Sequence, residues 1–375
     1  MGGKQNYQRI VVGMMDGFGM DYFKMTDMPN LKQMANEGFF KEVKGLFPSI
    51  TNVNNVSICC GAWPDEHGIT GNSYFNETTG KAEYMNAADL IRVDTLFQRA
   101  ARLGIKSALL TSKRKTVELF NRDTEIAIAA EEPPSEYINR YGRPADIYSR
   151  EINYWLWEVA VDILKTRPDI GCVYVHITDY PMHTWDPGQM ESKEHLQKLD
   201  NLIGKARETG LDAAFFFTAD HGMNYKKQCW DLVKVCKEKG APIRFALSPE
   251  RDYYVKHHRN FTGCAHVWLK TPDDAKKVID IIRDLKGVEE VISTVDAASR
   301  FHLIPSHIGD LTVTGDKDTM FGDLETPYEK LPPTYRAHGS LHEMDLPLII
   351  FNLNDDLPST QEFQTNKDLT RFLYR

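Results

Sequence analysis

The chain has 375 residues, of which 42% are hydrophobic and 26% are charged, and its formal net charge is -8 at pH 7. These values are typical of a globular protein that is large enough for more than one structural unit. The acidic balance argues against a general nucleic-acid binder, and no apolar run is long enough to cross a bilayer. A site for small anions stays compatible with this charge, because local lysines can form a positive pocket.

Six cysteines are spread along the chain, and two of them, Cys59 and Cys60, are adjacent. This arrangement does not resemble a disulfide framework. The apolar run from Ile10 to Met15 is too short for a signal peptide. We therefore expect a reducing, cytoplasmic location. The sequence does not fix the oligomeric state, and a homodimer is one arrangement that it allows.

Short apolar runs alternate with helical patterns along the chain, which predicts an α/β fold with a mostly parallel central sheet flanked by helices. The first buried strand is predicted in RIVVGMM, directly before Asp16. Thr51 then precedes a predicted helix, NVNNVSICC, which Gly61 would end. Further strands are predicted, in chain order, at residues 105–111, 171–178, 213–218 and 346–352.

A longer helix is predicted between the second and third of these strands, within residues 149–168. Ser149 is a suitable N-cap, and Pro168 lies just beyond the expected end. The apolar residues that share one face of this helix are Ile152, Trp155, Val159 and Ile163.

The pattern changes from about residue 249. Residues 264–269, 272–287 and 288–294 predict a strand, a helix and a second strand, and an extended segment follows at 310–316. We predict that residues 249–333 form an inserted, smaller α+β cap domain, and that a linker rich in Pro and Gly returns the chain to the last core strand. The catalytic core would then consist of residues 1–248 and 334–375.

Three of the predicted strands lead into an aspartate, at Asp16, Asp179 and Asp220. Because ligands bind beyond the carboxyl ends of the strands in an open α/β sheet, we expect these acids to meet there. A single aspartate at such a place is more often a helix N-cap, but three together repel one another unless cations neutralise them. His221 follows Asp220 directly, and His183 lies four residues after Asp179. The mixture of carboxylate and imidazole donors predicts a site for zinc, manganese or iron.

Thr51 is the candidate nucleophile, although a threonine at the start of a helix is commonly just its N-cap. Free backbone N–H groups at a helix start bind phosphate-like anions. A hydroxyl group placed there beside a dication can ionise and attack phosphorus. Cys59 and Cys60 fall inside the same helix, where buried thiols pack, and we expect both to belong to the core.

Six motifs resemble the alkaline phosphatase superfamily, namely MMDGFG, FPSITNVNN, HGITGN, TDYPMH, TADHGMN and RAHGSLHEMDLPL. The similarity runs from residue 16 to residue 347 in the order of that superfamily. It is greatest to the branch of nucleotide pyrophosphatase/phosphodiesterases and phosphonoacetate hydrolase. The resemblance implies an alkaline-phosphatase-like fold and a hydrolase with two divalent metal ions, Zn²⁺ in the first place, with Mn²⁺ or Fe²⁺ as alternatives.

The resemblance also assigns roles to individual residues. It implies one metal held by Asp179, His183 and His338. It implies a second metal held by Asp16, Asp220 and His221, with Thr51 as both nucleophile and additional ligand. Asn72, in HGITGN, matches the position that hydrogen-bonds a phosphoryl oxygen.

The segment LLTSKRKTVELF bears on the substrate. Phosphonoacetate hydrolases carry a similar T-x-K-x-K stretch whose lysine binds the substrate carboxylate, and Lys113 and Lys115 match it. Two lysines in a turn are, by composition alone, more often solvated. A cation at that carboxylate would stabilise the charge that develops as a P–C bond breaks. The leading expectation is hydrolysis of phosphonoacetate to acetate and phosphate through a phosphothreonine intermediate.

Two alternatives stay open. A phosphodiesterase or nucleotide pyrophosphatase would expel an alkoxide and would use aromatic surfaces, for which Tyr180 and Trp185 are available. Thr184 stands where the phosphonoacetate branch carries a basic residue, which leaves other phosphonates and phosphate esters as substrates. A catalytically inactive metal-binding protein is the distant alternative, and it predicts a missing ligand or nucleophile that the motifs do not show. In each enzymatic case the partner is a small anionic phosphonate or phosphate ester.

Overall fold

The largest sheet of the computed structural model, which describes residues 7–375, has seven strands. Five of them are the strands predicted from the apolar runs. β18 alone runs opposite to the other six strands, so the mostly parallel central sheet is confirmed. In order across the sheet the strands are β2 (Phe39–Lys44), β18 (Asp345–Phe351), β8 (Ala214–Thr218), β1 (Ile10–Met14), β7 (Ile170–His176), β5 (Lys106–Thr111) and β6 (Ile126–Ala129).

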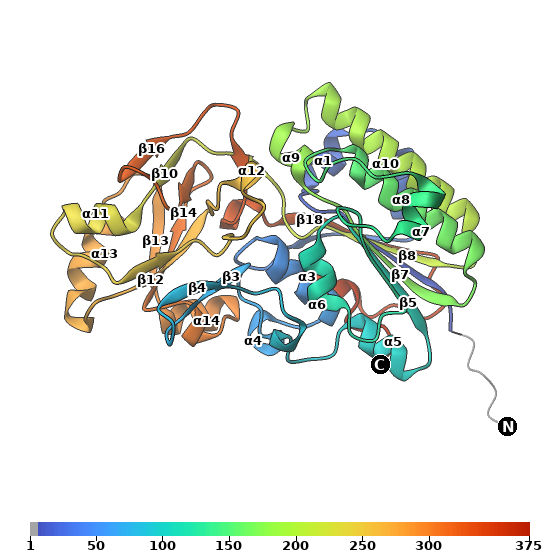
Figure 1. Cartoon of the computed structure of the whole chain (residues 1–375), viewed down its shortest axis with the longest axis horizontal. Coiled ribbons are helices and arrows are strands. Elements are labelled where there is room, and N and C mark those ends of the chain that lie inside the picture. Colours follow the sequence, from blue (N-terminus) through green and yellow to red (C-terminus); the bar gives the residue numbers. More distant parts are fainter. Residues whose placement is uncertain (1–6) are drawn as a thin grey trace.

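Helices cover both faces of this sheet, with α8 and α10 packed together on one side and α3, α5 and α6 on the other (Figure 1). The helix predicted within residues 149–168 is α8, and it buries the four apolar residues of the predicted face. The helices are α1 (Met20–Met25), α2 (Pro29–Glu37), α3 (Thr51–Cys60), α4 (Pro64–His67), α5 (Leu96–Arg102), α6 (Arg114–Phe120), α7 (Ser135–Tyr141), α8 (Glu151–Thr166), α9 (Tyr180–Thr184) and α10 (Met190–Thr209).

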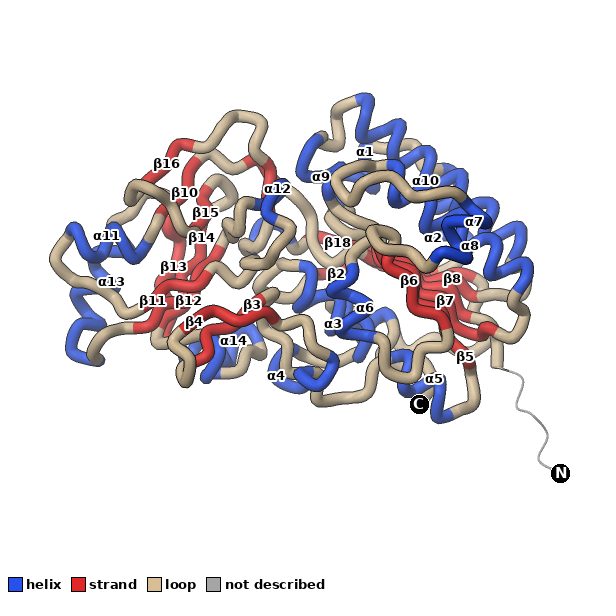
Figure 2. Tube along the Cα trace, viewed as in Figure 1, coloured by secondary structure: helices blue, strands red, loops and turns tan. Residues whose placement is uncertain are grey.

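A second group of sheets lies beside the central sheet and has its own hydrophobic cluster (Figures 1 and 2). One sheet has the order β11 (Phe245–Leu247), β12 (Cys264–Trp268), β14 (Leu311–Gly315) and β13 (Val288–Ser293). Another has the order β15 (Thr319–Phe321), β10 (Gln228–Trp230) and β16 (Tyr328–Lys330). The helices of this part are α11 (Leu232–Glu238), α12 (Val255–His258), α13 (Ala275–Arg283) and α14 (Thr294–Phe301).

The predicted strand–helix–strand pattern of this part is present as β12, α13 and β13. The division of the chain at residues 249 and 333 stays a prediction. Three elements that precede residue 249, β10, α11 and β11, belong to the sheets and the hydrophobic cluster of this part. Two short pairs complete the sheets, β9 (Asn224–Tyr225) with β17 (Arg336–Ala337), and β3 (Ser73–Asn76) with β4 (Lys81–Tyr84).

All six cysteines are buried free thiols, including Cys59 and Cys60 near the end of α3, so their placement in the core is confirmed. Gly61 ends α3 in the left-handed conformation, as predicted. None of the helices within residues 7–375 combines the length and the apolar character that crossing a bilayer requires.

Candidate active site

The three predicted aspartates come together at the carboxyl edge of the central sheet. Asp16 follows β1, Asp179 follows β7 and Asp220 follows β8, and β1 lies between the other two strands. Because the three strands are parallel, their carboxyl ends point the same way, and all three acids are at most 2% exposed. One oxygen of Asp220 accepts the backbone N–H groups of Gly17 (3.0 Å) and His221 (2.9 Å). Its other oxygen is therefore left facing the neighbouring acids.

The three predicted histidines are each held through Nδ1 by a backbone carbonyl. His183 Nδ1 lies 2.7 Å from the oxygen of Arg336, His221 Nδ1 lies 2.9 Å from that of Gly222, and His338 Nδ1 lies 2.8 Å from that of Ser49. Because a carbonyl only accepts, each Nδ1 carries a proton, which leaves Nε2 as the lone-pair donor of the neutral ring. This backbone support is typical of histidines that bind metals.

Burial favours the neutral form of two of these rings. It lowers the pKa of His221 and lowers that of His338 well below the usual value for histidine. The rings of His221 and His338 are stacked with their centroids 3.5 Å apart. Two parallel imidazoles at this distance would repel if both were charged, so both act as lone-pair donors near neutral pH.

The donors of these residues fit divalent cations. Ligand atoms of Asp16, Asp220 and His221 lie within 4.8 Å of one another, and so do those of Asp179, His221 and His338. His183 Nε2 lies 2.8 Å from Asp179 Oδ2. The buried side-chain atoms of residues 7–375 that make no hydrogen bond include Asp16 Oδ1, Asp220 Oδ2 and His338 Nε2. Buried lone pairs of this kind are costly unless a cation or a proton takes them up.

The pKa values of the neighbouring acids Asp16 and Asp220 are shifted in opposite directions. Burial raises the pKa of Asp220 well above its usual value, and the charge of Asp16 raises it further. Burial and Asp179 also disfavour ionisation of Asp16, but Lys113 and a hydrogen bond from His176 outweigh them and lower its pKa. One carboxyl group of this pair therefore holds a proton that a metal would displace.

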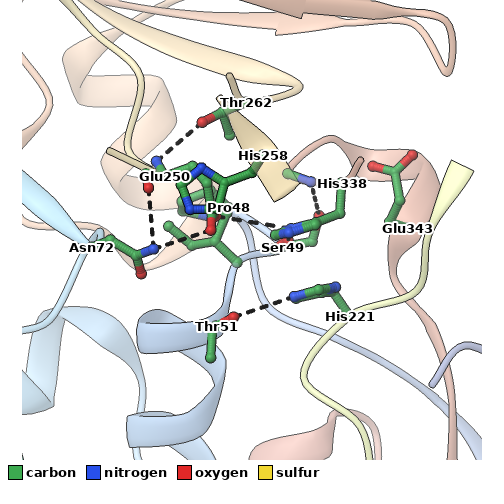
Figure 3. Close-up of polar contacts among 12 residues, drawn as sticks. Pro48, Ser49, Thr51, Asn72, His221, Glu250, His258, Thr262, His338 and Glu343 are labelled. Atoms are coloured by element: carbon green, nitrogen blue, oxygen red, sulfur yellow. Dashed lines mark hydrogen bonds and ion pairs between the residues drawn. The ribbon is translucent and has the colours of Figure 1, made fainter. Parts of the chain in front are cut away.

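Thr51 is the first residue of α3, and Ile50 before it is the N-cap, so the interpretation of Thr51 as the N-cap is wrong. Its side chain is buried, and its Oγ1 lies 3.5 Å from Nε2 of His221 (Figure 3). The hydroxyl group therefore lies at the amino end of a ten-residue helix and beside the predicted metal ligands. This end of a helix favours negative charge.

The two predicted lysines are buried, so the alternative of a solvated turn is wrong. Lys113 Nζ lies between Asp16 (2.9 Å) and Asp179 (3.2 Å), and thus between acids assigned to different metals. Lys115 Nζ lies instead 2.5 Å from Asp252. Although the two lysines are only two residues apart, they pair with different acids.

Four residues of the site were not assigned to it from the sequence, namely His176, Glu250, Asp252 and His258. His176 Nε2 lies 3.2 Å from Asp16 Oδ2. Asn72 donates through Nδ2 to the carbonyl (3.2 Å) and side chain (3.1 Å) of Glu250, as Figure 3 shows. Two adjacent histidines stand in this part of the sequence, His257 and His258. His258 is buried against Asp252, and the side chain of His257 lies outside the described part of the structure.

A profile of the family described as type I phosphodiesterase / nucleotide pyrophosphatase matches residues 10–341. A pyrophosphatase/phosphodiesterase of Schizosaccharomyces pombe is 27% identical over 230 residues, which are 57% of this chain and 44% of that protein. The human bis(5'-adenosyl)-triphosphatase is 25% identical over 230 residues, covering 59% of this chain and 48% of its own. The chain thus spans about half the length of these curated relatives.

Crystal structures give a similarity over the whole chain. Phosphonoacetate hydrolase from Sinorhizobium meliloti, solved with phosphonoacetate and with phosphonoformate, is 26% identical with a TM-score of 0.85. The match covers 98% of this chain and 96% of that one. Murine ectonucleotide pyrophosphatase/phosphodiesterase 5 is 14% identical with a TM-score of 0.68, covering 92% and 88%. At that identity the second likeness concerns the fold alone.

Proposed function

Since this chain belongs to the type I phosphodiesterase / nucleotide pyrophosphatase family of the alkaline phosphatase superfamily, we propose that it is a two-metal hydrolase acting through Thr51. The reaction breaks a bond between phosphorus and carbon, or between phosphorus and oxygen, in a small anionic substrate. The observation that carries this proposal is the position of the Thr51 hydroxyl, at the start of α3 and 3.5 Å from His221 in the cluster of predicted metal ligands.

The donor set suits two divalent ions, with Zn²⁺ preferred over Mn²⁺ or Fe²⁺. When bound, such ions supply Lewis acidity, which favours the ionised hydroxyl and neutralises charge on phosphoryl oxygens. Asp179, His183 and His338 would hold one ion. Asp16, Asp220, His221 and Thr51 would hold the other.

The residues of the chain then have the following roles. Thr51 Oγ1 attacks phosphorus, a new P–O bond forms, and the bonding pair of the broken bond leaves with the departing group. Asn72 binds a phosphoryl oxygen through its amide. If the departing group is an acetate carbanion, Lys113 and Lys115 stabilise its carboxylate, and the carbon takes a proton from solvent. Water then hydrolyses the phosphothreonine and regenerates the Thr51 hydroxyl.

Phosphonoacetate is the leading substrate candidate. It is supported by the likeness to phosphonoacetate hydrolase over the whole chain and by the two buried lysines beside the acids. A phosphodiester or nucleotide pyrophosphate is the second candidate, because the family description and the curated relatives name those activities. A cytoplasmic location stays part of the proposal, because the six buried cysteines do not form a disulfide framework.

A panel of substrates tests the function directly. Phosphonoacetate, p-nitrophenyl phosphate and a p-nitrophenyl phosphodiester are incubated with protein loaded with zinc or manganese and with protein stripped of metal. We expect turnover of at least one substrate only with metal. Thr51→Ala should keep the metals bound and abolish turnover. Substantial hydrolysis by Thr51→Ala would remove Thr51 from its role, and inactivity on all three substrates with metal bound would favour a non-catalytic metal protein.

A further inference from the structure

Asp252 lies on the segment between β11 and α12 and is 4% exposed. Its Oδ2 lies 2.5 Å from Nζ of Lys115 and 3.4 Å from Nδ2 of Asn72. The same carboxylate oxygen therefore contacts Lys115, which the proposed function places at the substrate carboxylate, and Asn72, which it places at the phosphoryl group.

The segment around Asp252 holds this carboxylate in place. Its Oδ1 accepts the backbone N–H of Tyr254 (2.7 Å) and lies 2.9 Å from Nε2 of His258. The backbone N–H of Asp252 donates to the side chain of Asn260 (3.0 Å). With both oxygens and the N–H group engaged, Asp252 is a fixed part of the site wall, whereas the lysine that it contacts has a long, flexible side chain.

The pairing of Lys115 differs in kind from that of Lys113. The partners of Lys113, Asp16 and Asp179, are predicted metal ligands, so bound metals would share their charge. Asp252 is assigned to neither metal, so its negative charge stays next to Lys115 and His258 in a buried place, where charges are poorly screened. A substrate carboxylate that approaches Lys115 meets an ammonium group that is already neutralised.

We propose that Asp252 is a specificity-determining residue that weakens the hold of Lys115 on a substrate carboxylate. It thereby lowers the preference of the site for carboxylate-bearing phosphonates over phosphonates and phosphate esters that lack this group. The inference rests on the proposed function, because that function gives Lys115 and Asn72 their place at the substrate. The mechanism is electrostatic, because the carboxylate of Asp252 lies directly next to the ammonium group of Lys115.

Two ligands that differ in a single group measure the effect. Phosphonoformate carries a carboxylate on phosphorus where methylphosphonate carries a methyl group. Their dissociation constants are measured by isothermal titration calorimetry on metal-loaded protein. Asp252→Asn should raise the affinity for phosphonoformate relative to methylphosphonate by about tenfold, because a unit charge next to the binding cation is removed. Asp252→Ser, which removes the charge with a smaller side chain, should shift the ratio in the same direction and serves if the asparagine variant folds poorly.

Two controls identify the cause. Glu329→Gln removes one negative charge from an exposed pair with Arg259, and it should leave the ratio unchanged. In the double variant Lys115→Met with Asp252→Asn, the tenfold gain should disappear, because the gain depends on the freed lysine.

The outcomes separate the two claims. The inference is overturned if the affinity for phosphonoformate relative to methylphosphonate is unchanged or lower in both Asp252 variants, or if the gain survives Lys115→Met. In either case the proposed site is retained as long as methylphosphonate binds. If neither ligand binds the metal-loaded wild-type protein, the proposed function fails and the inference falls with it.

Discussion

Two buried clusters of acids and histidines lie close together in this protein, and they differ in where their positive charge comes from. We call Asp16, Asp179, Asp220, His183, His221 and His338 the core cluster, and Glu250, Asp252 and His258 the loop cluster. Both have the composition and spacing of a metal site. In the loop cluster, Asp252 already contacts Lys115 and His258. In the core cluster, Lys113 serves two acids, while Asp220 Oδ2 and His338 Nε2 accept no hydrogen bond from any residue within 7–375.

The protonation of the acids follows the same division. Burial opposes the ionisation of Asp252, but Lys115 and His258 outweigh it and lower its pKa. For Glu250, burial and the charge of Asp252 outweigh Lys115 and Lys113 and raise its pKa well above the usual value, which favours a neutral acid. The loop cluster is thus balanced without a metal. Acids near histidines therefore do not by themselves define a metal site. What decides whether such a cluster binds a metal is whether the chain supplies its own cations.

The largest expected effect is a difference in metal binding between the two clusters when one acid charge is removed from each. Asp16→Asn should lower metal affinity about 100-fold or more and turnover by about 10³-fold or more, because a ligand and the activation of Thr51 are both lost. Asp252→Asn should keep the same metal content as the wild type. Metal content is read by mass spectrometry after dialysis against a defined free-metal buffer.

Circular dichroism and thermal unfolding of the two variants provide the control, because both must retain the fold. Loss of metal from Asp252→Asn together with full metal content in Asp16→Asn would reverse the assignment of the two clusters.

A further buried acid, Glu343, allows the same question to be asked of protein stability. The side chains of Lys226 and Glu343 are fully buried, with Nζ and Oε1 2.8 Å apart. Glu343 is thus an acid that depends on an internal lysine, as Asp252 is. Lys226→Met should destabilise the protein by about 3–5 kcal/mol, because it leaves the carboxylate buried without a counter-charge. Urea unfolding measures this change.

The double variant Lys226→Met with Glu343→Gln is the matched control, and it should recover part of the loss because no charge is then left unpaired. A single variant that unfolds at the wild-type urea concentration would show that the lysine is not what balances Glu343.

Much of the fold was predictable because its strands are buried on both faces. The strands β1, β5, β7, β8 and β18 have nearly continuous apolar sequences, and all were predicted. The two missed strands of the central sheet, β2 and β6, lie at its edges. In β2 exposed lysine and glutamate alternate with less exposed residues, and β6 has only four residues, so neither forms a clear apolar run.

The site was predictable where a residue follows a strand, and not where distant segments meet. Asp16, Asp179 and Asp220 could be grouped because parallel strands bring their carboxyl ends to one edge. His338 came only from the family resemblance. Nothing local marks Asp252 as a partner of Lys115, since 137 residues separate them and the contact depends on how the second group of sheets packs against the first. Nothing local marks His176 as a partner of Asp16 either, and their contact depends on the register of β1 and β7.

A smaller effect is expected from a residue that supports a ligand. His176 Nε2 lies 3.2 Å from Asp16 Oδ2, and its ring is fully buried. His176→Phe should lower metal affinity by about 10–100-fold, because supporting hydrogen bonds orient metal ligands and tune their charge. His258→Phe, the equivalent change in the loop cluster, should leave metal affinity unchanged. Competition with a chromogenic chelator measures both.

His176→Gln is the conservative variant, because its amide can still donate to Asp16, and it should recover part of the affinity. Equal losses in the phenylalanine variants at positions 176 and 258 would mean that both clusters take part in metal binding.

The smallest effect concerns the protons that metal binding displaces. The folded protein raises the pKa of Asp220 through burial and the nearby Asp16, so this carboxyl group holds a proton at pH values where a free aspartate is ionised. It must release that proton to bind a metal. Metal affinity should therefore rise with pH, by up to about tenfold per pH unit below the pKa of Asp220 and not above it. His221 and His338 have lowered pKa values and are already neutral, so they should release none near pH 6.5.

Calorimetric titrations in two buffers of different ionisation enthalpy count the released protons. The assignment fails if proton release follows an ordinary imidazole titration near pH 6.5, or if Asp220→Asn releases as many protons as the wild type, because the displaced proton would then belong to the histidines.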